Sequence, residues 1–163
     1  MKHFGTATLV SILVLTTAFP GVSSSPPRAF VYPLVGTQVS SKYGDRRHPI
    51  LKIVRHHEGV DLVAPSKAPV RSIADGVVVF ASRYGGYGNL VVVRHSGQMT
   101  SHYGHLDKFS VRPGQHTKAG QILGEVGTTG RVTGPHLHFE VRIDGKVQDP
   151  QKYIKGLALP AQG

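Results

Sequence analysis

The sequence predicts an all-β protein built from antiparallel strands, and three observations support this fold class. The 163 residues include 20 Gly and 11 Pro spread along the chain, and both residue types favour turns over long helices. Short runs rich in Val and Ile lie between them, as in strands bounded by tight turns. Beyond the N-terminal region no long stretch has helical apolar periodicity, so we expect a helix at most in the last residues.

Four runs are the clearest strand candidates, because β-branched and apolar side chains recur in them between turn residues. In chain order they are Val77–Ser82, Leu90–Arg94, Gly120–Gly127 and His136–Ile143. The glycine-rich segment Arg83–Asn89 is expected to connect the first two, with Asn89 as a turn residue. Asp144-Gly145, after the last run, is typical of a hairpin turn, which makes its flanking strands antiparallel.

The first 24 residues resemble a secretory signal peptide, with a basic start at Lys2 and an apolar run over Ala7–Phe19. The run is too short to span a membrane, so we expect no stable membrane span after cleavage. An uncleaved anchor or a frayed apolar tail is the alternative. We expect a Ser/Pro-rich linker at 25–30, one folded domain at 31–155 and a C-terminal tail at 156–163.

Composition narrows the chemistry of the mature chain. Because no cysteine is present, disulfides and thiolate ligands are excluded, and any metal must use His, Asp or Glu. Lys and Arg number 19 against 9 acidic residues, and loss of Lys2 leaves 18 against 9, or about +9. The basic residues are scattered singly without interleaved aromatic side chains, so no nucleic acid partner is expected. Anionic envelope polymers fit an exported basic protein better.

The run His136–Ile143 places polar side chains on one strand face. Successive side chains point to opposite faces, so His136, His138 and Glu140 share one face, and the apolar residues between them share the other. Glu140 could fix the tautomer of an imidazole, but a solvated or structural carboxylate is the interpretation that we favour.

A second histidine cluster lies at Arg55–Asp61. Two ligands of one zinc ion lie about 3 to 4 Å apart, whereas residues four apart on a straight strand are separated by about 13 Å. His57 and Asp61 therefore need a bent backbone, which Gly59 tolerates. On residue type alone, His56 could replace His57 as the ligand.

A third histidine element, Ser101–Leu106, includes His105, and taken alone it is compatible with a surface histidine in a β-turn. The remaining histidines of the mature chain have no partner pattern and are expected at the surface: His48, His95, His102 and His116.

Three ordered motifs then carry a family resemblance: His57-x-Gly59-x-Asp61, Tyr103-Gly104-His105-Leu106 and the run Thr133–Glu140. With the upstream run Tyr43–Ile50, they resemble the M23 (lysostaphin/LytM-type) zinc metallopeptidases over roughly residues 31–153. The resemblance implies a compact antiparallel β-sheet domain of the barrel-sandwich or duplicated-hybrid-motif type, with a substrate groove. It also implies one Zn²⁺ per chain and a set of site residues, with ligands His57, Asp61 and His138 and two non-ligand catalytic histidines, His105 and His136.

The chemistry of this donor set agrees with a catalytic site. Two imidazoles and one carboxylate leave a tetrahedral zinc ion one open position, where a water has a pKa of about 7. The resemblance therefore predicts an exported zinc endopeptidase of the periplasm or cell wall, which hydrolyses peptide stems or cross-bridges of peptidoglycan. A D-alanyl–diaminopimelyl link and a glycine bridge are both candidate bonds, and no particular oligomeric state is predicted.

Two other functions stay open. One is a non-catalytic LytM-type regulator that binds and activates a cell-wall amidase, against which the five intact site positions argue. The other is a phosphocarrier with paired active-site histidines, against which the export signal argues.

Overall fold

The computed structural model describes residues 30–47 and 53–154. The predicted signal peptide, nearly all of the predicted linker, and the C-terminal tail lie outside these residues, so the domain boundaries stay predictions. The all-β prediction is confirmed, because the only helical elements of the described residues are two short 3₁₀ turns, η1 (Gly85–Tyr87) and η2 (Pro150–Lys152). No helix within the described ranges is long and apolar enough to cross a membrane.

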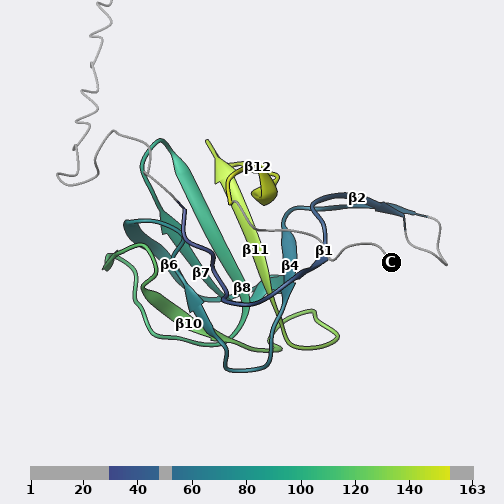
Figure 1. Cartoon of the computed structure of the whole chain (residues 1–163), viewed down its shortest axis with the longest axis horizontal. Coiled ribbons are helices and arrows are strands. Elements are labelled where there is room, and N and C mark those ends of the chain that lie inside the picture. The colour runs from purple at the N-terminus through teal and green to yellow at the C-terminus, as the bar shows by residue number, and fades with distance from the viewer. Residues whose placement is uncertain (1–29, 48–52, 155–163) are drawn as a thin grey trace, which may run out of the picture.

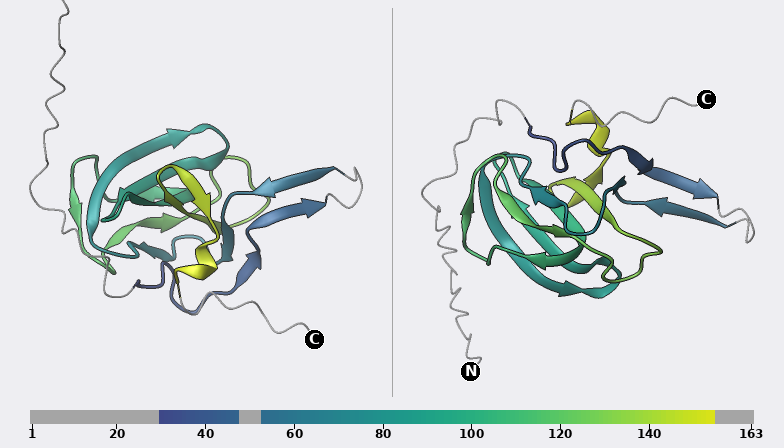
Figure 2. Two further views of the ribbon diagram at one scale, coloured as in Figure 1. Left: turned by 90° about the horizontal axis from the view of Figure 1, so that it is seen from above. Right: turned by 60° about the horizontal axis from the view of Figure 1, so that its bottom comes forward.

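Ten strands form one sheet in which all strand pairs are antiparallel, in the order β1-β4-β11-β8-β7-β6-β9, with β12 added to β11 and β10 joining β5 to β8. These strands are β1 (Val39–Ser41), β4 (Val60–Val63), β5 (Pro69–Arg71), β6 (Gly76–Tyr84), β7 (Gly88–Arg94), β8 (Met99–Phe109), β9 (His116–Thr117), β10 (Ile122–Val126), β11 (His136–Ile143) and β12 (Lys146–Gln148). A separate two-stranded ribbon, β2 (Gly44–Arg47) with β3 (Val54–His57), extends away from the sheet (Figures 1 and 2).

All four predicted strands are present, with β11 at the predicted bounds and β6, β7 and β10 shifted by a few residues. The predicted hairpin is confirmed, because Asp144 (φ 50°) and Gly145 (φ 74°) form the turn between β11 and β12. The prediction that Asn89 is a turn residue is wrong. The η1 turn makes the connection shorter, so Asn89 lies in β7 and its side-chain amide donates to the Asp107 carbonyl at 2.9 Å.

The core lies on the apolar face of β11. Leu137, Phe139 and Val141 are fully buried, and the Phe139 ring packs against Tyr103 of β8 with centroids 5.4 Å apart. Burial of such a side chain stabilises the fold by about 1.5–3 kcal/mol. The same packing fixes the orientation of β11, so its opposite face presents the alternate residues, including His136 and His138.

The prediction that His95 lies at the surface is wrong, since its side chain is buried in a polar network. Its Nδ1 lies 2.8 Å from the Asp75 carbonyl oxygen, which can only accept, and its Nε2 lies 2.7 Å from the Ser101 hydroxyl. Ser101 in turn bonds the Tyr103 hydroxyl at 2.8 Å, which accepts from the Ile73 amide at 3.0 Å. Burial lowers the pKa of His95, so the ring is neutral inside this network.

The same prediction is wrong for His102, whose side chain is only 16% exposed and lies 4.0 Å from a Glu140 oxygen. Burial lowers the pKa of His102 to about 4. His116 is exposed, as predicted, and His48 lies outside the described residues.

Candidate metal centre

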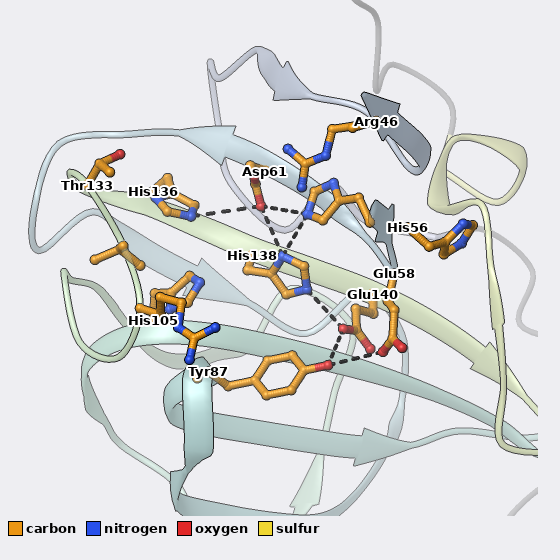
Figure 3. Close-up of a pocket in the computed structure, with 14 residues that line it drawn as sticks. Arg46, His56, Glu58, Asp61, Tyr87, His105, Thr133, His136, His138 and Glu140 are labelled. Carbon is orange, nitrogen blue, oxygen red and sulfur yellow. Dashed lines mark hydrogen bonds and ion pairs between the residues drawn. The ribbon is translucent and has the colours of Figure 1, made fainter. Parts of the chain in front are cut away.

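Two neighbouring strands and the ribbon bring three potential ligands together. Asp61 of β4 lies directly opposite His138 of β11, so their side chains share one face of the sheet, and His57 ends β3. One ligand atom from each of the three residues lies within 4.8 Å of the others. Asp61 Oδ1 is 3.1 Å from His57 Nε2 and 2.9 Å from His138 Nδ1, and the two nitrogens are 3.2 Å apart (Figure 3).

The predicted bend between His57 and Asp61 is present, at Glu58-Gly59 between β3 and β4. The reason for the glycine differs from the expected backbone freedom. A Cβ atom on Gly59 would lie 2.3 Å from the Phe139 carbonyl oxygen, so the glycine permits close approach to β11.

The outer hydrogen bonds of the two imidazoles decide which nitrogens face the cluster. His57 Nδ1 lies 2.7 Å from the Lys42 carbonyl oxygen, and His138 Nε2 lies 2.9 Å from a carboxylate oxygen of Glu140. Because both oxygens only accept, each outer nitrogen carries the hydrogen. In the neutral rings, His57 Nε2 and His138 Nδ1 therefore present lone pairs toward Asp61. Lone pairs at this spacing fit a divalent cation, because ligand atoms around zinc lie about 3 to 4 Å apart.

Protons compete with a cation for this cluster. Burial opposes ionisation of Asp61, but hydrogen bonds with His138 and His57 outweigh it and hold the pKa of Asp61 well below its usual range. Burial likewise favours neutral His138, yet Asp61 and Glu140 raise the pKa of His138 to about 9. A cation must displace these protons, so metal binding should weaken at acidic pH.

Glu140 is fully buried against His138. Of the favoured interpretation, a solvated or structural carboxylate, the solvated part is therefore wrong. Tyr87 donates to it at 2.7 Å and Arg142 Nε at 2.8 Å. Burial opposes ionisation, but the hydrogen bonds from His138, Tyr87 and Arg142 lower the pKa of Glu140 to about 2. Arg142 also donates to Glu58 at 2.7 Å, which ties the ribbon end to β11.

The sequence did not predict the residues that surround Glu140, namely Tyr87, Arg142 and Glu58. Arg142 follows the alternation of His138 and Glu140 and could have been placed on their face. Tyr87 and Glu58 come from distant segments and carried no local signal.

His105 reaches the site through an irregularity in β8. Between Val91↔Tyr103 and Asn89↔Leu106, β8 has one more residue than β7, and His105 adopts φ 62°. Such a bulge re-aims a side chain. The segment Ser101–Leu106 lies within β8, which excludes the alternative of a surface histidine in a β-turn.

His105 and His136 lie beside the cluster with ring centroids 4.8 Å apart (Figure 3). His105 Nδ1 is 2.9 Å from the Thr129 carbonyl oxygen, and His136 Nδ1 is 2.9 Å from the Gly134 carbonyl oxygen. With Nδ1 donating to a carbonyl oxygen, the neutral form of either ring has its lone pair on Nε2. His136 Nε2 lies 3.8 Å from Asp61 Oδ1. Burial lowers the pKa of His105 to about 4.

The structure separates His56 from His57. His56 is exposed and its Nδ1 lies 2.7 Å from Asp45 Oδ1, outside the cluster. A groove of about 540 Å³ opens over the site. Besides the five predicted residues its lining includes Arg46, Glu58, Tyr87, Arg131 and Thr133.

Known peptidases are similar to this chain in sequence and in structure. The sequence model of peptidase family M23 matches residues 55–150. The DD-carboxypeptidase/endopeptidase Mpg of Neisseria meningitidis serogroup B is 49% identical over 120 residues, which are 74% of this chain and 28% of that protein. The peptidoglycan DD-endopeptidase ShyC of Vibrio cholerae serotype O1 is 42% identical over 120 residues, 73% of this chain and 28% of that protein.

A solved structure of a zinc-containing peptidase from Vibrio cholerae superposes with a TM-score of 0.72 at 38% identity, and covers 82% of this chain and 41% of that one. The chain thus spans less than a third of the length of the two curated relatives.

Proposed function

The chain belongs to peptidase family M23, and from this premise we propose that it is an exported zinc endopeptidase that hydrolyses peptide cross-links of bacterial peptidoglycan. The observation that carries the proposal is the cluster of His57, Asp61 and His138, whose outer hydrogen bonds leave two nitrogen lone pairs and a carboxylate oxygen facing one another. Imidazole ligands suit zinc better than magnesium or calcium. We assign one Zn²⁺ per chain to these three residues.

The protein's own groups supply the remaining chemistry. When bound, zinc would lower the pKa of a coordinated water to about 7 and polarise the scissile carbonyl. His105 and His136, each held by a backbone carbonyl through Nδ1, offer Nε2 to accept a proton from the attacking water. The histidine that takes this proton can then return it to the departing amine. Burial keeps His105 neutral before the reaction.

The substrate assignment rests on the relatives and on charge. Relatives named DD-endopeptidases favour a bond between two D-configured centres, as in the D-alanyl–diaminopimelyl link, over a glycine bridge. A net charge of +10 attracts an anionic wall, and this attraction should weaken with salt. The predicted signal peptide supports action in the periplasm or cell wall.

A regulator that activates an amidase is the second candidate. It would need the groove but neither the three-residue cluster nor two histidines with free Nε2 atoms beside it. All five residues converge in this structure, which favours the enzyme.

Digestion of purified cross-linked muropeptide dimers tests the proposal. The zinc-loaded chain should convert dimers to monomers, which mass spectrometry detects. A chelator should stop the reaction, and added zinc should restore it. His116→Ala, at an exposed histidine of β9 that does not line the groove, is the control that should keep activity. A zinc-loaded chain that releases no monomer but stimulates an amidase would favour the regulator instead.

A further inference from the structure

The β2–β3 ribbon has two different faces. In its antiparallel register Gly44 lies opposite His57, and Arg46 lies opposite Arg55. Directly opposed residues, and residues two apart on one strand, share a face. Arg46 and Arg55 therefore lie on the face of His57, whereas the neighbouring Asp45–His56 pair lies on the other. Two guanidinium-bearing residues are thus paired beside a proposed metal ligand.

This pair has no acidic partner. Like charges directly opposite each other destabilise a strand pair, and a carboxylate beside the pair would offset this repulsion. All nine Asp and Glu residues of the chain lie within the described residues, and no ion pair joins any of them to Arg46 or Arg55. The acidic residues close to the ribbon have other partners: Asp45 binds His56, Glu58 binds Arg142, and Asp61 belongs to the cluster.

Arg46 is also directed toward the site. It lines the groove, and its guanidinium donates to the Ser41 hydroxyl. As the diagonal neighbour of His57 across the ribbon, it starts about 7–8 Å from that residue. Figure 3 shows its side chain extending from the strand toward the side of the cluster where Asp61 lies. Arg55 does not line the groove but lies opposite Arg46 on the ribbon. An anion in the groove can therefore reach Arg46 and the metal site directly, and Arg55 through its place beside Arg46.

We propose that Arg46 and Arg55 bind a substrate carboxylate next to the scissile amide. This inference rests on the proposed function and refines its substrate. In a D-alanyl–diaminopimelyl link, the carbon that bears the amide nitrogen also carries a free carboxylate, whereas a glycine bridge has only hydrogen there. Arginine binds carboxylates through paired, charge-assisted hydrogen bonds. The arginine pair would therefore select the diaminopimelyl link.

Arg131 is the other groove arginine without an acidic partner in the described residues. It lies in the segment before β11, with no second arginine paired across a strand from it. We therefore assign the carboxylate to the ribbon, and Arg131 serves as the comparison.

Two synthetic cross-linked peptides test the assignment. They differ only in that carboxylate, which is free in one and a carboxamide in the other. Zinc-loaded wild type should cleave the carboxylate peptide with a kcat/KM about 10- to 100-fold higher, the range for a hydrogen bond to a charged group. The double variant Arg46→Gln/Arg55→Gln should lose this preference, so that it cleaves the two peptides with similar kcat/KM values. Arg47→Gln, on the opposite face of the ribbon, should keep the preference.

Each outcome decides the question once zinc content has been measured for every variant. The inference is overturned if the double variant keeps the preference, if it loses activity on both peptides equally, or if Arg131→Gln alone removes the preference. If zinc-loaded wild type cleaves neither peptide, the proposed function fails, and this inference fails with it.

Discussion

Replacing Glu140 by Gln should weaken metal binding although Glu140 contacts no metal. Its buried carboxylate accepts from His138 Nε2 at 2.9 Å, which leaves Nδ1 as the lone pair that faces Asp61. The neutral amide of a Gln accepts a weaker hydrogen bond and can also present its NH₂ group, which would favour the wrong tautomer. Loss of such a partner of a ligating histidine typically weakens metal affinity by about 10- to 100-fold. A charge-assisted hydrogen bond of about 1.5–3 kcal/mol gives the same range.

Competition with a chromophoric chelator measures the zinc dissociation constants of wild type and Glu140→Gln directly. Glu58→Gln is the matched control, because Glu58 binds the same Arg142 at 2.7 Å but does not touch His138. Glu58 is half exposed, and a pair of this kind contributes about 0–1 kcal/mol, so the control should change affinity little. Unchanged affinity in Glu140→Gln, or an equal loss in both variants, would refute the tautomer argument. Thermal unfolding of the metal-free variants checks that both fold.

Three further predictions follow from the site and the core. His138→Ala should abolish zinc retention, whereas His136→Ala should keep the metal and lose activity. Metal analysis and digestion assays on both variants check this prediction. Equal loss of metal in the two variants would overturn the division of roles. Gly59→Ala should lower the free energy of unfolding, measured by urea titration, by about 1–3 kcal/mol, because its Cβ would lie 2.3 Å from a carbonyl oxygen of β11. The control Gly134→Ala, whose Cβ would meet no atom within 4 Å, should unfold in urea as wild type does. The free energy of unfolding should fall as pH falls below about 6.5, the pKa of unfolded histidine, because burial lowers the pKa of His95 in the folded state. Urea titrations at pH 7.5 and 5.5 should show a smaller loss of stability in His95→Gln than in wild type. An equal loss in the two proteins would exclude His95 as a source of this pH dependence.

The sequence predicted β11 to the residue because its period-two pattern is unbroken. Leu137, Phe139 and Val141 bury one face, so the alternation placed His136 and His138 on the other face without any tertiary information. The pairing of β11 with β4 and β8 was not visible in this way, since it depends on contacts between distant segments.

The alternation fails where the backbone is irregular. In β8 the bulge at Gly104-His105 breaks the period, so only the family resemblance singled out His105. At Gly59 the bend was predicted, but the close approach of β11 that requires glycine depends on tertiary packing.

Buried polar residues were the least predictable from sequence. His95 was expected at the surface because its partners, Asp75 and Ser101, become neighbours only in the folded sheet. Glu140 was expected to be solvated or structural for the same reason, since Tyr87 and Arg142 complete its environment. For a single histidine or glutamate, the sequence predicts an exposed side chain. Only tertiary contacts show the hydrogen bonds that compensate for its burial.

Crystallographic anomalous scattering at the zinc edge tests the central claim most directly. Crystals of the zinc-loaded chain should show one anomalous peak bonded to His57 Nε2, His138 Nδ1 and a carboxylate oxygen of Asp61, with bonds of about 2.0–2.2 Å. A peak elsewhere on the chain, or coordination through His56 or through His138 Nε2, would contradict it.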